Sequence, residues 1–122
     1  MIRVLDEMPE GVIGVEATGK LSAEDYAAVL APALDAATEG GGKIRIVRFF
    51  PGEFDGMEPG AMWQDMKTGV REWSAWERIA LVTDHVWMRD GLRLLAWAIP
   101  GEVKAFSASE RDAAVAWTAA TA

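Results

Sequence analysis

The stretch KIRIVRFFPGEFDGMEPG, residues 43–60, decides the fold, because it joins the most apolar extended segment of the chain to an elaborate loop. Five apolar side chains fall within residues 44–50, and turn-forming glycines precede them while Pro51 and Gly52 follow them. Apolar residues at both odd and even positions predict a strand covered on both faces, which is typical of parallel sheets. We therefore expect an internal strand at Ile44–Phe50, followed by a site loop at Pro51–Glu58.

The composition limits the class of protein. The chain has 122 residues, which suits one domain with its own core, and it has no cysteine. Disulfides, thiolate nucleophiles and cysteine-ligated zinc are excluded, and a cytoplasmic location is permitted. A formal net charge of −7 disfavours nucleic acid and anionic membranes as partners. Without a signal peptide or an apolar stretch of about 20 residues, we expect a cytoplasmic protein with no stable membrane insertion.

The first half of the chain predicts a hairpin and a helix. The apolar segments Ile2–Leu5 and Val12–Thr18 are separated by polar residues and turn formers, which favours a β-hairpin. Ser22 can cap a first helix, in which apolar residues recur at helical spacing. Pro32 lies inside this apolar stripe and removes one backbone donor, so we expect a bend rather than two helices. The glycines at 40–42 end the helix.

The second half alternates helices and strands. Pro59 falls in the first turn of a second helix, where its missing N–H costs nothing. The later elements are a strand at Ile79–Thr83, a helix at Gly91–Ile99 capped by Asp90, a strand at Glu102–Phe106 and a last helix after Ser107. The order β-β-α-β-α-β-α-β-α predicts right-handed crossovers and a mostly parallel sheet. We therefore expect an α/β fold in one domain over residues 1–122.

Five segments together resemble a known family, although each alone is weak. They are GKLSAEDYAAVLAPALDAA at 19–37, KIRIVRFFPGEFDG at 43–56, WQDMKTG at 63–69, WERIALVTD at 76–84 and FSASERDAAVAW at 106–117. In order and spacing they resemble the SpoIIAA-like proteins, which are related in fold to STAS domains and more distantly to the CRAL-TRIO lipid-binding fold. The resemblance implies a mixed, mostly parallel five-stranded sheet with about four helices, usually without known catalysis.

The family relation also bears on the loop after the central strand. In the anti-sigma-factor antagonists this loop leads to a serine whose phosphorylation disrupts partner docking. Here Pro51–Glu58 contains no serine or threonine, so we expect no phosphorylation in it. Glu53, Asp55 and Glu58 could instead supply permanent negative charge near the start of the second helix, where the helix macrodipole favours it. The alternative is an ordinary acidic capping loop.

Arg48 is unusual because it lies in a strand that is otherwise apolar on both faces. A buried charge without a partner is very costly, so a carboxylate should lie near it. Asp84 and Asp55 are the expected partners, because both follow strands that end at the same edge of the sheet. Arg48 is then either a member of a structural ion pair or an anion-binding residue in the crevice.

We expect no catalytic residue, no cofactor and no metal. His85, the only histidine, follows a predicted strand on the side where open α/β sheets bind ligands. A general base needs a hydrogen-bonded constellation, and the sequence offers none around it. Four acidic residues lie on the two predicted loops, namely Glu53, Asp55, Asp84 and Asp90. Their spacing matches no calcium-binding loop, so we expect them to be solvated rather than to bind Mg²⁺.

The six tryptophans are many for a chain of this length, and a domain this small cannot easily enclose all of them. We expect Trp63, at the head of the second helix, and Trp87, before the third helix, to be partly exposed.

Three functions remain open. The first is a regulatory or protein-binding module that docks through the Phe54–Trp63 loop and the second helix. The second is a binder of a small apolar or amphipathic ligand between the second and third helices, in a pocket lined by Met62, Met66, Trp87 and Leu95. The third is an enzyme, for which we find no constellation. Exposed aromatic residues without a cavity would favour the first function, and a closed pocket would favour the second.

A homodimer is also expected. The helix at Gly91–Ile99 has apolar residues on nearly every side, yet in so small a domain it must lie on the outside of one sheet. An apolar patch left over on a soluble protein usually marks an interface, and two-fold pairs are the commonest homo-oligomers. The sequence therefore predicts self-association through the second and third helices.

Overall fold

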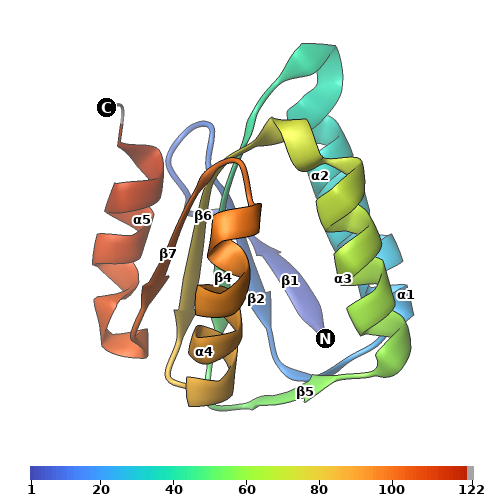
Figure 1. Ribbon diagram of the computed structural model, residues 1–122, viewed down its shortest axis with the longest axis vertical. Helices are drawn as coiled ribbons and strands as arrows, with labels where there is room; N and C mark the ends of the chain where they lie inside the picture. The colour runs from blue at the N-terminus through green and yellow to red at the C-terminus, as the bar shows by residue number, and fades with distance from the viewer. Residues whose placement is uncertain (121–122) are drawn as a thin grey trace.

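The computed structural model describes residues 1–120, apart from the side chain of Leu95. Its centre is a five-stranded sheet with the strand order β1-β2-β4-β6-β7 (Figure 1). The strands of this sheet are β1 (Ile2–Leu5), β2 (Ile13–Ala17), β4 (Ile44–Phe50), β6 (Trp76–Thr83) and β7 (Glu102–Phe106). The helices are α1 (Ala23–Asp25), α2 (Ala31–Thr38), α3 (Pro59–Arg71), α4 (Val86–Leu95) and α5 (Arg111–Ala119). A π-helical turn at Tyr26–Leu30 joins α1 to α2, and 3₁₀ turns occupy Glu39–Gly41, Trp73–Ala75, Ala96–Ala98 and Ala108–Glu110.

The sheet is mixed and mostly parallel, as the sequence predicts. Strand β1 pairs with β2 antiparallel, and all other pairs in this sheet are parallel. Strand β4 lies between β2 and β6, with Ile46 opposite Ile13 on one side and Ile79 on the other. The prediction that Ile44–Phe50 is internal and that the N-terminal hairpin supplies the antiparallel pair is confirmed.

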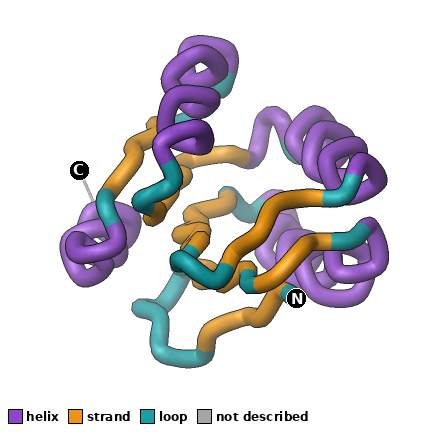
Figure 2. The backbone as a smooth tube through the Cα atoms, turned by 90° about the horizontal axis from the view of Figure 1, so that it is seen from below, coloured by secondary structure: helices purple, strands orange, loops and turns teal. Residues whose placement is uncertain are grey.

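The two faces of the sheet are covered unequally (Figures 1 and 2). Helices α1 to α4 lie over one face, where Ile44, Ile46 and Phe50 of β4 point into the larger apolar core. Helix α5 alone lies over the other face, where Val47 and Phe49 point into a second, smaller core. The alternation along β4 thus places Arg48 on the same face as α3 and α4.

Pro32 produces a π-helical turn in the first helix. The backbone N–H of Ala31 donates to the carbonyl of Tyr26, which is the wider i to i+5 spacing of a π-helix. Pro32 follows directly and has no N–H to donate, so the widened turn ends where the regular ladder could not continue. The helical path continues through Thr38, and Ser22 caps its start as predicted, accepting the N–H of Asp25 at 3.2 Å.

Two predicted elements differ from the structure. The loop after β4 contains a short strand, β5 (Phe54–Met57), which pairs in parallel with β3 (Gly19–Leu21) in a separate two-stranded sheet. Helix α4 begins at Val86 rather than after Asp90. Met88 and Leu92 both pack on the core one helical turn apart, so the helix must include both residues, and this packing outweighs the start signal of Asp90.

Candidate functional site

A groove of about 310 Å³ lies between α3 and α4 over the sheet. Its floor comes from β4, β6 and α2, and its walls come from α3, α4 and the 3₁₀ turns that follow these two helices. The described lining residues are Leu30, Leu34, Ile46, Arg48, Asp65, Met66, Thr68, Gly69, Val70, Trp73, Trp76, Ile79, Leu92, Ala98 and Ile99. Most of this lining is apolar, which is typical of ligand sites.

The groove exists because α3 and α4 rest on the core without being buried in it. Helix α3 buries only Ala61 and Thr68 along its 13 residues. Met62, Met66 and Val70, which lie one turn apart along the helix, are 59%, 61% and 67% exposed. An apolar stripe of this kind normally packs against a core. Within residues 1–120 no element covers these three side chains.

One polar cluster lies at the floor of the groove. A guanidinium nitrogen of Arg48, Nη2, lies 3.1 Å from the carboxylate of Asp65 and donates to the hydroxyl of Tyr26 at 2.7 Å. The Tyr26 hydroxyl donates in turn to the Asp65 carboxylate at 2.7 Å. Strand β4, helix α3 and the π-helical turn each supply one member, so the cluster ties three elements together.

The surroundings of Tyr26 and Arg48 raise the pKa of both groups, which keeps the phenol neutral and the guanidinium charged. Burial raises the pKa of Tyr26, and the nearby Asp65 raises it further, against the opposing effect of the Arg48 charge. Burial alone would lower the pKa of Arg48, but Asp65 and Tyr26 more than offset it, so that pKa is raised. The cluster therefore holds a cation, an anion and a neutral phenol, with no net charge.

The expected partners of Arg48 were wrong. Its carboxylate is Asp65 on α3, whereas Asp84 accepts the backbone N–H of Ala108 at 3.0 Å and so supports the turn before α5. Asp55 lies in β5 with its side chain exposed. The sequence analysis does not single out Asp65, because it falls inside an apolar helical pattern. A carboxylate between Met62 and Met66 is nevertheless a signal that a polar group lies opposite it.

Several other predicted residues lie away from the groove. Phe54 is 2% exposed, so it is a core residue and cannot dock a partner. Its ring contacts those of Phe50, His85 and Trp87, with centroids 4.8, 5.9 and 6.4 Å away. His85 lies 3.1 Å from the carbonyl of Pro51 through Nε2. Glu53, like Asp55, lies exposed in the segment after β4, and neither lines the groove as described.

The pocket expected from the sequence is only partly present. Met66 lines the groove, whereas Met62 and Trp87 are exposed and are not among its described lining residues, and the side chain of Leu95 lies outside the described structure. Trp63 and Trp87 are both 57% exposed, which confirms the prediction for these two tryptophans. Trp87 lies within α4 rather than in a loop before it.

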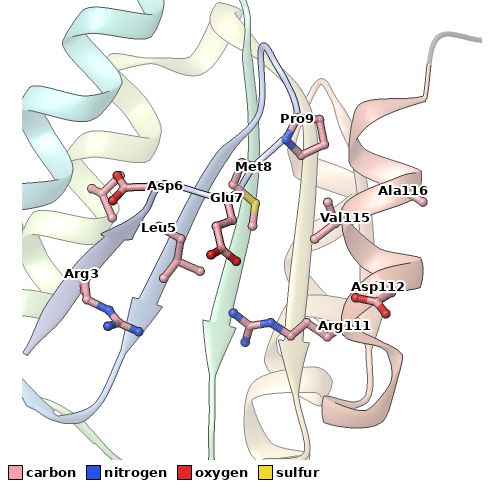
Figure 3. A pocket seen from close by; sticks show the side chains of 11 residues that line it. Arg3, Leu5, Asp6, Glu7, Met8, Pro9, Arg111, Asp112, Val115 and Ala116 are labelled. Atoms are coloured by element: carbon pink, nitrogen blue, oxygen red, sulfur yellow. The ribbon is translucent and has the colours of Figure 1, made fainter.

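A second hollow, of about 660 Å³, lies between the β1–β2 connection and α5 (Figure 3). Arg3 and Arg111 approach it from opposite sides, and both contact Glu16, at 3.0 and 3.6 Å. The Arg111 guanidinium also lies 3.9 Å from the centre of the Phe49 ring. Its two cations already have an acidic partner, and its lining mixes charged and apolar side chains, so it is the weaker candidate for a site.

None of the helices within residues 1–120 has the length and apolar character needed to cross a membrane.

Comparison with known proteins places the chain in a family. A family model described as SpoIIAA-like matches residues 12–119. A crystal structure of an uncharacterized protein from Shewanella loihica PV-4, of the DUF3478 family and with a SpoIIAA-like fold, is 28% identical. The similarity covers 96% of this chain and 93% of that one, with a TM-score of 0.77. No curated protein matches this chain. Because the family model spans most of the sequence, the chain belongs to the SpoIIAA-like family.

Proposed function

We propose that the protein is a non-catalytic binding module that holds a small apolar or amphipathic ligand in the groove between α3 and α4. The observation that carries this proposal is the groove itself, which is mostly apolar and has one polar cluster at its floor. A few polar groups in an otherwise apolar cleft are the usual arrangement of a small-molecule site. Its volume of about 310 Å³ lies at the lower end of such sites, which favours a small ligand.

The chain supports this function without catalysis. The polar residues in the described lining are Arg48, Asp65 and Thr68, and the first two are already bound to each other. No base, nucleophile or metal cluster is needed for a module that only binds and releases its ligand. The cysteine-free sequence is compatible with a cytoplasmic location, which is part of this proposal.

A pair of glycine variants tests the groove. Gly69 of α3 lines it, and a Cβ added there meets no atom within 4 Å, so Gly69→Leu should place a side chain in the open space. Gly91 of α4 offers the same open surroundings and is not part of the described lining, so Gly91→Leu is the matched control. Native mass spectrometry of protein from its own host should show a copurified small molecule in the wild type and in Gly91→Leu. Loss of that mass from Gly69→Leu alone is expected; retention in both variants would contradict the proposal.

A second function, protein docking, is favoured by exposed apolar side chains on the two helices that wall the groove. Trp63, Trp87, Leu94 and Trp97 are 57%, 57%, 74% and 86% exposed, and they lie on α3, on α4 or just after α4, outside the described lining. A small ligand inside the groove would leave these side chains in water. We propose that they form the contact of a two-fold dimer, because a second copy offers a matching apolar surface.

Sedimentation equilibrium tests the dimer. A dimer is expected at tens of micromolar, and Leu94→Glu should dissociate it without unfolding the chain. Ala113→Glu, which places the same charge on the exposed side of α5, is the control and should leave the dimer intact. A monomeric wild type would rule out the dimer and would leave the ligand proposal untouched.

A further inference from the structure

We infer that the polar group of the groove ligand is a neutral hydrogen-bond acceptor, such as a ketone or ester carbonyl, and not a carboxylate. This inference rests on the proposed ligand-binding function and adds the chemical class of the ligand. It follows from two observations at the floor of the groove, the unused donors of Arg48 and the balance of charge around them.

The guanidinium of Arg48 has more donors than the described chain uses. Nη2 makes both contacts, to Tyr26 and Asp65, and Nε is buried without a partner. No hydrogen bond joins Nη1 to the described residues, and the side chain is 20% exposed in a residue that lines the groove. Nε has almost no accessible surface, so a ligand oxygen in the groove would bond to Nη1 rather than to Nε, and it gains affinity by pairing a donor that otherwise lacks an acceptor.

The charge balance decides which acceptor fits. Among the described lining residues only Arg48 and Asp65 are charged, and they lie 3.1 Å apart, so the groove has no net charge. A carboxylate would add a second negative charge beside Asp65, within apolar walls and in a chain of net charge −7. A neutral carbonyl oxygen accepts the same hydrogen bond without that penalty. An unsubstituted hydrocarbon would leave the donors of Arg48 unpaired.

Two probes of equal chain length test this inference. 2-Decanone carries a neutral acceptor and decanoate an anionic one at pH 7, and binding of each to the full chain is followed by titration calorimetry. We expect 2-decanone to bind about tenfold more tightly or better, because both probes can accept the same hydrogen bond but only decanoate brings a negative charge beside Asp65 and within apolar walls. The ¹⁵N–¹H signals of the Arg48 guanidinium should move when 2-decanone binds, because its donors gain an acceptor.

The double variant Arg48→Met with Asp65→Asn removes both charges together and leaves neither unpaired. Its affinity for 2-decanone should fall about tenfold, which is the scale of one hydrogen bond to a charged group, while some binding of both probes remains. If this variant does not fold, the Arg48 signals of the wild type decide alone. Decanoate binding as tightly as 2-decanone, or unmoved Arg48 signals, would overturn the inference and leave the groove a binding site. Binding of neither probe, together with no ligand loss in Gly69→Leu, would overturn the proposed function and the inference with it.

Discussion

Helices α5 and α3 lie over opposite faces of the same sheet, but α5 packs on it much more closely than α3 does. Ala114 and Thr118 of α5 are fully buried, and Trp117 packs on Phe106 with ring centroids 6.0 Å apart. Helix α3 buries two of its residues and turns its large apolar side chains to solvent. One face of the domain is thus finished within the chain, and the other presents apolar surface that an occupant could cover.

The α5 face is also closed electrostatically. Arg45 and Arg78 lie directly opposite each other on β4 and β6, where two like charges alone would be destabilising. Both guanidinium groups donate to carbonyls at the end of α5, including that of Ala120 at 2.7 and 3.0 Å. Glu77 and Glu102 pair with Arg45 and Arg78. The last carbonyls of α5 carry partial negative charge and add to this pairing, so the two arginines hold that end of the helix. Helix α3 is held to the sheet by fewer polar contacts, namely the Asp65–Arg48 pair and a hydrogen bond of 3.1 Å from the Trp76 indole to the carbonyl of Gly69.

This difference teaches where stability and binding reside. A face that stabilises the fold needs close packing, capped helices and paired polar groups, whereas a binding face must keep apolar surface accessible.

The largest effect is expected from one substitution made on both faces. Trp117→Ala on the α5 face should lower the free energy of unfolding by about 2–4 kcal/mol, because it empties space against Phe106 and removes the ring beneath Arg78. Trp97→Ala should change the free energy of unfolding of the monomer, measured at concentrations below those at which the chain dimerises, by no more than about 0.5 kcal/mol, because that side chain is 86% exposed in the single chain. Urea unfolding of both variants measures this. Equal losses at those concentrations would show that Trp97 packs against its own chain, whereas a larger loss that appears only at tens of micromolar is what the proposed dimer predicts.

A smaller loss of unfolding free energy is expected when the Arg48–Asp65 ion pair of the groove face is broken. Asp65→Ala leaves the Arg48 charge without its carboxylate and should cost about 1–3 kcal/mol, less than a fully buried pair because Asp65 is 39% exposed. Asp35→Ala, which removes an exposed pair with Arg71, is the matched control and should cost less than about 0.5 kcal/mol. Urea unfolding again gives the difference. If Asp65→Ala were as mild as its control, the polar cluster would not hold α3 in place.

Alkaline pH should weaken the same cluster. Tyr26 is the only tyrosine, so its ionisation can be followed directly by the phenolate absorbance. Its pKa is raised in the folded state, whereas in the unfolded chain it is close to 10. Below pH 10 both states are neutral and stability is unaffected. Above pH 10 the unfolded chain loses its proton first, so stability should fall, by at most about 1.4 kcal/mol per pH unit.

The control for this titration is Tyr26→Phe, which removes the titrating group. The part of the alkaline loss due to Tyr26 should be absent from it. Phenolate absorbance that appears in the folded wild type near pH 10 would show that Tyr26 is open to solvent and not part of a buried cluster.

The sequence predicts the sheet well and the groove poorly, for a physical reason. The apolar run of β4 and the Ser22 cap depend on neighbouring residues alone, and both are correct. The start of α4 and the partner of Arg48 depend on contacts between distant elements. Asp65 lies 17 residues beyond Arg48 in the chain and meets it only because α3 crosses back over β4. The sequence predicts a loop where strand β5 lies, because its partner, β3, is only three residues long and gives little signal of a strand.

The smallest expected effect is a gain in stability at the start of α3. Glu58 is the N-cap residue there, with extended backbone angles of φ −67° and ψ 154°, but its side chain makes no capping hydrogen bond. Aspartate is among the best N-cap residues, because its shorter side chain reaches the first free amides of the helix. Glu58→Asp should therefore raise the free energy of unfolding by about 0.5–1 kcal/mol. Glu53→Asp makes the same change in the same segment away from the cap and should have no effect.

A gain in Glu58→Asp that equals its control would show that the start of α3 is limited by something other than capping. The more informative measurement is the amide exchange of α3 in the ligand-free protein. A helix that rests on few buried contacts should open locally more often than α5, and a cap stabilises it without touching the groove. Slower exchange in α3 of Glu58→Asp, with unchanged exchange in α5, would show that α3, a wall of the groove, is only partly stabilised by the chain itself. An occupant of the groove would then add the stability that α3 lacks.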